Sequence, residues 1–133
     1  YMTYLALGKY PDIWRCGVAG AGIVDWEEMY ELSDSIFKKF MEILFAGKKK
    51  LFRDRSPIKY VERVKAPLCI IHPQNDTRTP LIPVIKYMTK LLALGRTFEA
   101  HIIPEMGHII SRVEDAVKIL LPAIVFLKKY LES

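Results

Sequence analysis

Cysteine is scarce in this sequence, and a hydrophobic run long enough to span a bilayer is absent. The 133 residues include two cysteines, Cys16 and Cys69, each inside an apolar run. Two thiols do not make the disulfide framework of a small secreted domain, so both are predicted to be buried and reduced. No apolar run reaches the roughly 20 residues of a transmembrane helix, and the opening YMTYLALGKYPD lacks the features of a signal peptide. We therefore expect a cytoplasmic protein without a membrane partner.

The sequence also lacks internal repeats, low-complexity segments and linkers rich in proline, glycine or serine. Residues 1–133 are therefore predicted to form one unit, or part of a larger domain, with no second domain. The net charge is +5, and part of it is concentrated in the segment GKKKLFRDR, residues 47–55. Such a segment could bind a nucleic-acid backbone. A solvated, charged connection over residues 48–57 is the simpler interpretation, and we expect no nucleic-acid partner.

Apolar patterns and turn residues predict alternating helices and strands. The predicted helices cover residues 2–9, 25–47 (one or two helices), 57–64, 81–95 and 112–132, and the predicted strands cover 16–22, 66–72 and 97–104. Ser56 and Ser111 are expected to cap the helices that follow them. Strands that alternate with helices form parallel sheets covered by helices. The prediction is an α/β fold with about three parallel strands flanked by helices.

The strand at 16–22 is expected to be an exposed edge of this small sheet. Its sequence, CGVAGAG, is apolar throughout, and exposed apolar edges pair readily with other strands. Parallel sheets usually contain more than three strands and are buried on both faces. The chain is therefore predicted to belong to a larger sheet or to pair with another chain, with a homo-oligomer as the expected assembly.

One acid and one histidine directly follow the last two predicted strands. Asp76 lies in IIHPQNDTRTP (70–80) and His108 lies in IIPEMGHII (102–110). Ligands of open parallel sheets bind beyond the carboxyl ends of the strands. A histidine can act there as general base and acid, and an aspartate bonded to it fixes its tautomer. The alternative is that Asp76 is a turn residue and His108 a surface residue, and the pattern alone leaves both interpretations open.

A nucleophile for such a pair is missing from the sequence. None of the serines lies in a Gly-x-Ser-x-Gly turn; they are Ser33, Ser35, Ser56, Ser111 and Ser133. A metal site is not predicted either, because His72, Asp76 and His108 lack a zinc-like spacing. His72 and His101 are interpreted as strand histidines, in the core or at an edge. No cofactor is expected.

Several short motifs occur together in one order: Ser56-Pro57, Ala66-Pro67, HPQNDTRTP and MGH. This set resembles the C-terminal part of the α/β-hydrolase domain of the prolyl oligopeptidase family, which includes acylaminoacyl peptidases and dipeptidyl peptidases. The opening YMT and the later DIWRCGVAGAGIVDW resemble the residues that directly follow the nucleophile elbow of that family. The acid loop departs from the family pattern twice, with His72-Pro73 for His-Gly and Thr79-Pro80 for Val-Pro.

The resemblance implies a partial α/β-hydrolase domain over residues 1–133. By this resemblance Asp76 is the triad acid and His108 the base of a serine peptidase or acyl hydrolase that acts on peptides or acyl-peptides. The nucleophilic serine would lie just before Tyr1, so the chain alone is predicted to be inactive. The Asp25-Trp26 pair resembles a feature near the substrate cleft, which makes Trp26 a candidate substrate-binding residue; the alternative is a helix cap followed by a core tryptophan.

A second hypothesis gives the chain no catalytic role. In it, the chain is a folded fragment that self-associates through its exposed edge strand at residues 16–22. The reading frame before Tyr1 distinguishes the two hypotheses, because a Gly-x-Ser-x-Gly-Gly motif encoded there would indicate a segment of an enzyme.

Overall fold

The computed structural model describes residues 1–132 and contains a three-stranded parallel sheet in the order β1-β2-β3. The elements along the chain are α1 (Met2–Lys9), β1 (Gly17–Gly20), α2 (Trp26–Leu32), α3 (Ser35–Leu44), α4 (Lys50–Arg55), the 3₁₀ helix η1 (Pro57–Arg63), β2 (Leu68–Pro73), α5 (Leu81–Ala93), β3 (Phe98–Ile103) and α6 (Val113–Leu131). In the register, Leu68 lies opposite both Gly17 and Phe98. The predicted arrangement of about three parallel strands flanked by helices is confirmed.

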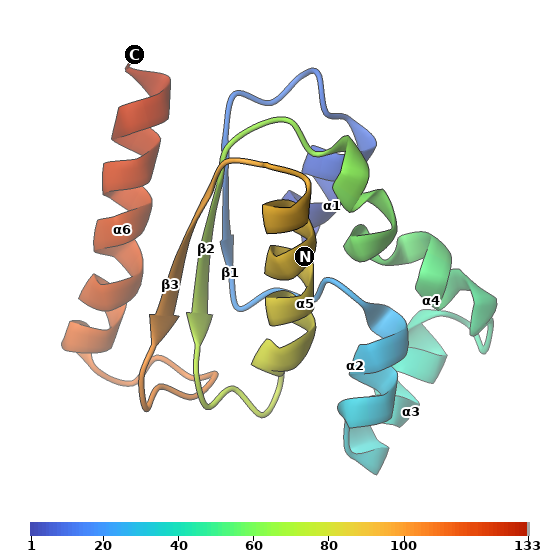
Figure 1. The fold of residues 1–133 in the computed structure, drawn as a ribbon. Coiled ribbons are helices and arrows are strands. Elements are labelled where there is room, and N and C mark those ends of the chain that lie inside the picture. The colour runs from blue at the N-terminus through green and yellow to red at the C-terminus, as the bar shows by residue number, and fades with distance from the viewer. Residues whose placement is uncertain (133) are drawn as a thin grey trace.

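Helices cover both faces of the sheet, with α1 and α5 on one side and α6 on the other (Figure 1). Every residue of β2 is buried, which explains why its sequence is an unbroken apolar run. Side chains alternate along β2, so Leu68 and Ile70 pack toward α1 and α5, whereas Cys69 and Ile71 pack toward α6. This two-sided core fixes the carboxyl ends of the strands, from which the functional loops emerge.

The structure differs from the prediction at residues 48–57, where α4 forms in place of a charged connection. Phe52 is the cause, because its ring is only 3% exposed and packs with Trp26 and Met41. The segment is mostly charged, and burial of this one aromatic ring favours a helix. In that helix the ring faces the core, and the lysines and arginines face solvent.

Ser56 occupies the predicted N-cap position before Pro57, but without a side-chain cap, and the predicted cap at Ser111 is wrong. The Ser56 hydroxyl does not cap η1; it accepts a hydrogen bond from the backbone N–H of Trp26 at 2.8 Å and donates one to the carbonyl of Phe52 at 2.7 Å. α6 begins after Arg112, without a side-chain cap, so Ser111 does not fill that role. The Ser56 side chain therefore joins α2 to α4, while its backbone occupies the N-cap position of η1.

None of the helices in residues 1–132 is both long and apolar enough to cross a membrane.

Candidate active site

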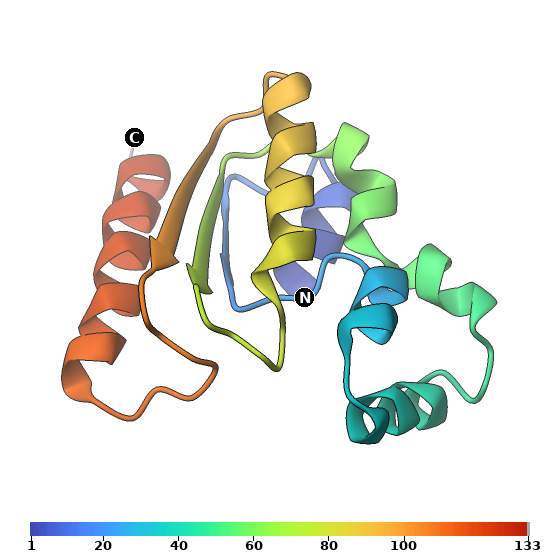
Figure 2. The same ribbon diagram turned by 60° about the horizontal axis from the view of Figure 1, so that its bottom comes forward.

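Asp76 and His108 meet at the carboxyl edge of the sheet. The Nδ1 atom of His108 lies 2.8 Å from Oδ2 of Asp76. The two residues come from the loops after β2 and β3, which emerge side by side because these strands are parallel neighbours (Figure 2). The Asp76 side chain is fully buried, whereas that of His108 is 39% exposed. The structure thus brings the two predicted residues together, with a buried carboxylate and a solvent-accessible imidazole.

The hydrogen bond decides which ring nitrogen of His108 is available. A carboxylate only accepts, so Nδ1 carries the proton that it donates to Asp76. In the neutral ring the lone pair is then on Nε2. A histidine held in this tautomer by an aspartate can accept a proton at Nε2 and later release it.

Asp76 accepts three further hydrogen bonds, all from the loop that follows it. Its Oδ1 accepts the backbone N–H groups of Arg78 at 2.9 Å and Thr79 at 2.7 Å, and its Oδ2 accepts the hydroxyl of Thr79 at 2.9 Å. Burial opposes ionisation of the carboxyl group, but the bonds from Thr79 and His108 outweigh it and hold the pKa of Asp76 below its ordinary value. Asp76 is therefore ionised at neutral pH.

His72 closes the same loop from inside the sheet. Its Nε2 lies 2.8 Å from the carbonyl oxygen of Thr79, so Nε2 carries the proton and donates it. The ring is fully buried, which confirms the prediction of a core histidine, and its Nδ1 has no hydrogen-bond partner within residues 1–132. Burial lowers the pKa of His72, against the raising effects of the Thr79 carbonyl and Asp76. His101 lies on the edge strand β3 and is partly exposed.

The start of the chain lies close to this site. The Thr79 hydroxyl is 3.0 Å from the carbonyl oxygen of Ala21, in the turn after β1. A Cβ atom added to the next residue, Gly22, would lie 3.1 Å from the backbone nitrogen of Tyr1 and 2.8 Å from the Tyr4 ring. The turn after β1 therefore connects the acid loop to the N-terminal end of α1, as Figure 2 shows.

Trp26 is a buried residue that also borders a cavity. The ring is 6% exposed and packs edge-on against Tyr1 at 5.3 Å and Phe45 at 5.1 Å between centroids. The cavity of about 360 Å³ beside it is lined by Tyr1, Trp26, Leu44, Phe45, Ala46, Lys48, Leu51 and Arg55. The indole Nε1 is buried and has no hydrogen-bond partner within the described residues.

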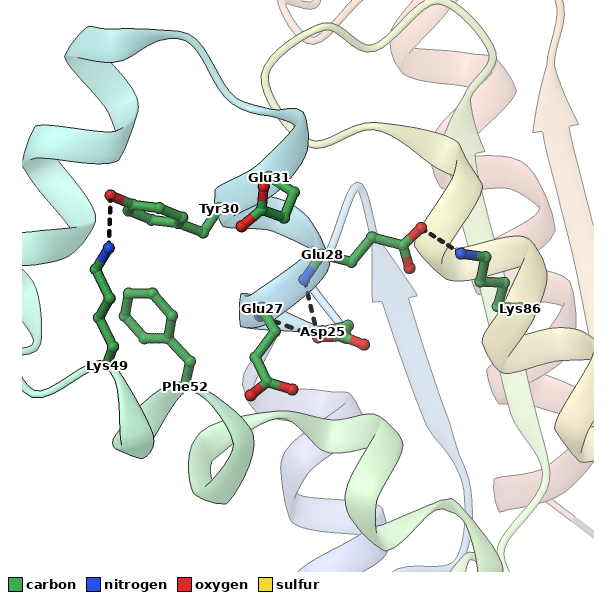
Figure 3. A pocket seen from close by; sticks show the side chains of 8 residues that line it. All are labelled: Asp25, Glu27, Glu28, Tyr30, Glu31, Lys49, Phe52 and Lys86. Atoms are coloured by element: carbon green, nitrogen blue, oxygen red, sulfur yellow. Dashed lines mark hydrogen bonds and ion pairs between the residues drawn. The ribbon is translucent and has the colours of Figure 1, made fainter.

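A more polar cavity of about 560 Å³ lies over α2 (Figure 3). Asp25 caps this helix, because its Oδ1 accepts the backbone N–H groups of Glu27 and Glu28 at 3.0 and 3.1 Å. Neither Asp76 nor His108 lines the cavity, whose residues are Asp25, Glu27, Glu28, Tyr30, Glu31, Lys49, Phe52 and Lys86. Within residues 1–132, no group of three or more His, Cys, Asp or Glu side chains could hold a metal ion.

Sequence reasoning missed Thr79 as a member of the site. The family pattern has valine at this position, so the resemblance gave Thr79 no role in the site. The signal that could have found it is its position three residues after an aspartate in a turn, where the aspartate side chain often accepts hydrogen bonds from the following residues.

Known proteins resemble this chain over its whole length. The sequence pattern of the prolyl oligopeptidase family matches residues 1–133. The chain belongs to the prolyl oligopeptidase family. It is 31% identical to the acylamino-acid-releasing enzyme of Rattus norvegicus over 142 residues, which cover 100% of this chain and 19% of that protein. The human acylamino-acid-releasing enzyme is 25% identical over 136 residues, which cover 96% and 19% of the two chains.

Solved structures of proteins related to this chain have the same fold. The structure of Pyrococcus horikoshii acylaminoacyl peptidase superposes with a TM-score of 0.86 at 28% identity and covers 98% of this chain and 22% of that chain. A puromycin-hydrolyzing peptidase of Mycobacterium tuberculosis has the same TM-score at 16% identity. These neighbours are α/β-hydrolase-fold peptidases, so the predicted fold is confirmed. The chain spans about a fifth of the length of these relatives.

Proposed function

We propose that this chain supplies the acid and the general base of a serine peptidase or acyl hydrolase. Asp76 is the acid, His108 is the base, and the nucleophilic serine comes from sequence outside residues 1–133. The observation that carries the proposal is the 2.8 Å bond between a buried, ionised carboxylate and the Nδ1 of a solvent-accessible histidine. Membership of a family of serine peptidases supports it.

The proposed reaction is acyl transfer to water in two steps. As the serine oxygen attacks the scissile carbonyl, His108 Nε2 accepts the serine proton, and the imidazolium then protonates the leaving amine. Water next attacks the acyl-serine, with His108 again taking and returning the proton. Asp76 stays ionised throughout and stabilises the imidazolium through Oδ2. The substrate is a peptide or an acyl-peptide, a class proposed from the family and from relatives named acylamino-acid-releasing enzymes.

The packing at Tyr1 supports an entry point for the missing serine. The backbone nitrogen of Tyr1 approaches Gly22, and the neighbouring Ala21 contacts Thr79 in the acid loop. A residue joined to Tyr1 would therefore enter on the side of the sheet where Asp76 and His108 lie. This position fits a triad whose order along the chain is serine, aspartate, histidine.

Trp26 is proposed to bind substrate from the aromatic cavity beside Tyr1. The Trp26 residue lines this cavity although its Nε1 atom is buried. The contact with substrate would therefore be made by the apolar part of the ring that borders the cavity. The alternative prediction, that Asp25 caps α2 and Trp26 packs in a core, is also met, and a ring that is mostly buried can still present one edge to a cavity.

A fluorophosphonate probe tests the catalytic proposal. We expect the 133-residue chain to keep its unmodified mass. A longer protein, expressed with the residues that its reading frame encodes before Tyr1, should gain one adduct on a serine in that added segment. In that longer protein, His108→Ala should slow labelling by up to about 10⁶-fold, whereas His101→Ala, on the edge strand, should leave the rate unchanged. An adduct on a serine of the 133-residue chain, or labelling that does not depend on His108, would contradict the proposal.

A second candidate function, self-association without catalysis, is favoured by one surface. An apolar cavity of about 510 Å³ follows the open edge of β1, between α1 and α6, and is lined by Met2, Thr3, Ala6, Leu7, Tyr10, Trp14, Cys16, Gly17, Val18 and Leu127. Within residues 1–132, β1 pairs only with β2. A second copy could cover this edge, and a homo-oligomer is the assembly we propose for the isolated chain.

A further inference from the structure

We propose that Thr79 is a positioning residue for the Asp76–His108 pair, an inference that rests on the proposed function. Its hydroxyl oxygen lies 2.9 Å from Oδ2 of Asp76, the oxygen that also accepts from His108. The same oxygen lies 3.4 Å from His108 Nδ1 and 3.0 Å from the carbonyl of Ala21. Thr79 is 8% exposed, so water does not readily replace its hydroxyl.

The hydroxyl has one proton and two nearby acceptors. Hydrogen bonds to an ionised acceptor are stronger than those to a neutral carbonyl, so the proton points to Oδ2 of Asp76. Oδ2 then accepts two donors, the Thr79 hydroxyl and His108 Nδ1, which together set the rotation of the carboxylate and the plane in which the imidazole is held. The donor from Thr79 also stabilises the ionised carboxylate on which the tautomer of His108 depends.

The backbone of Thr79 is fixed from two sides, which makes its side chain a rigid support. Its N–H donates to Oδ1 of Asp76 at 2.7 Å, and its carbonyl accepts from Nε2 of His72 at 2.8 Å. The residue therefore links the central strand, which carries His72, to the acid. Its hydroxyl oxygen also contacts the carbonyl oxygen of Ala21, in the turn beside Tyr1.

Valine is the matched replacement for Thr79, because it has the same shape and no hydroxyl. The prolyl oligopeptidase pattern has Val-Pro where this chain has Thr79-Pro80, so the backbone of the loop accommodates valine. The proposed role is therefore a feature of this chain and can be tested with little change in packing. Thr79→Ser keeps the hydroxyl and should rescue the effect, and Thr77→Val, at an exposed position in the same loop, is the control.

The test measures two properties of the folded 133-residue chain by NMR: the pKa of the Asp76 carboxyl and the exchange rate of the His108 Nδ1 proton. Thr79→Val should raise the pKa of Asp76, because a donor to its charged form is lost, and should speed exchange of the Nδ1 proton. Thr79→Ser and Thr77→Val should match the unsubstituted chain. The titratable groups that face Asp76 are His72 and His108, so the fit includes their titrations.

The outcomes separate this inference from the proposed function. If Thr79→Val leaves both properties unchanged while Asp76→Asn shifts the Nδ1 proton of His108, the pair stands and the role of Thr79 is overturned. If Asp76→Asn also leaves that proton unchanged, the pair itself is absent and the proposed function fails. Should Thr79→Val not fold, the hydroxyl proton of Thr79 in the unsubstituted chain decides: slow exchange supports the role, and exchange at the rate of a free hydroxyl overturns it.

Discussion

At the scale of single residues, Asp76 links the stability of the chain to pH. Its pKa is lowered in the folded chain, so the folded state favours the ionised form relative to the unfolded state, in which an aspartate has a pKa of about 3.9. Its contribution is therefore present above that pH and disappears as the pH falls through the lower folded value. Asp76→Asn should reduce the free energy of unfolding at pH 7 by about 1–3 kcal/mol, because four donors lose a charged acceptor.

Urea unfolding at several pH values checks this prediction. The deficit of Asp76→Asn should shrink as the pH falls toward 3, because the unfolded form of the unsubstituted chain then binds a proton at Asp76 more readily than the folded form does. Asp12→Asn is the control, since Asp12 forms an exposed ion pair with Lys65, and exposed pairs contribute little. A deficit that stays the same from pH 7 to pH 3 would show that the loss comes from packing and not from the charge.

His72 should also make the chain less stable as the pH falls, in a pH range above that in which Asp76 acts. Its pKa is lowered by burial, so the unfolded chain binds a proton more readily than the folded chain does. The folded state is therefore favoured fully above about pH 6.5, the ordinary histidine value, and loses stability as the pH falls below it. His72→Gln should flatten the dependence of the unfolding free energy between pH 7.5 and about pH 5.5, while His101→Gln keeps it. An unchanged slope in His72→Gln would contradict the assignment.

The residues of the site differ in how far the sequence alone could predict them. Asp76 and His108 could be predicted, because each follows an apolar strand and parallel strands end at one edge of a sheet. The contact between Thr79 and Ala21 could not, since it joins residues 58 positions apart and depends on how the turn after β1 meets the acid loop. The unsatisfied Nε1 of Trp26 is likewise a property of the packed structure.

At the scale of elements, burial decides which segments the sequence predicts well. β2 is buried on both faces and reads as an apolar run, and α5 and α6 have apolar positions at helical spacing. α4 was not predicted, because one buried ring, that of Phe52, holds a helix whose other residues are mostly charged. A local charge pattern cannot indicate that a distant cluster will bury one of its members.

The packing of α1 against η1 yields a prediction that contradicts helix propensity. A Cβ added at Gly8 would lie 2.6 Å from the Cβ of Tyr60 and 3.0 Å from its carbonyl oxygen. Alanine favours a helix over glycine by about 1 kcal/mol, yet Gly8→Ala should lower the free energy of unfolding by about 1–3 kcal/mol because the two backbones must separate. Gly20→Ala is the matched control, since its Cβ would meet only the Ile71 carbonyl at 4.0 Å. Thermal unfolding compares them, and a stabilised Gly8→Ala would rule out this close contact.

At the scale of the whole molecule, the outer face of α6 carries an apolar stripe that no other segment of residues 1–132 covers. Five of its side chains are more than half exposed, and with Leu127 they repeat at alternating intervals of four and three: Val113, Val117, Leu120, Ile124, Leu127 and Leu131. This spacing is typical of helices that pack against another helix. Leu127 also lines the apolar cavity at the open edge of β1, so the stripe and the edge form one continuous surface.

We expect this surface to drive self-association of the isolated chain. The hydrophobic effect favours removing its aliphatic side chains from water, and patches of this kind mark interfaces between proteins. Sedimentation velocity over a wide range of concentration should show a dimer or larger species that dissociates on dilution. Leu120→Lys combined with Ile124→Lys should shift the chain to a monomer, because two charges would lie on the stripe.

The control is Ile36→Lys, at a 79% exposed position on α3 far from α6 (Figure 1), which should leave the assembly unchanged. A monomer at every concentration would contradict self-association and would favour the rest of a hydrolase domain as the partner that covers this surface. An equal effect of all three lysine substitutions would indicate general charge repulsion and not a specific interface at the stripe.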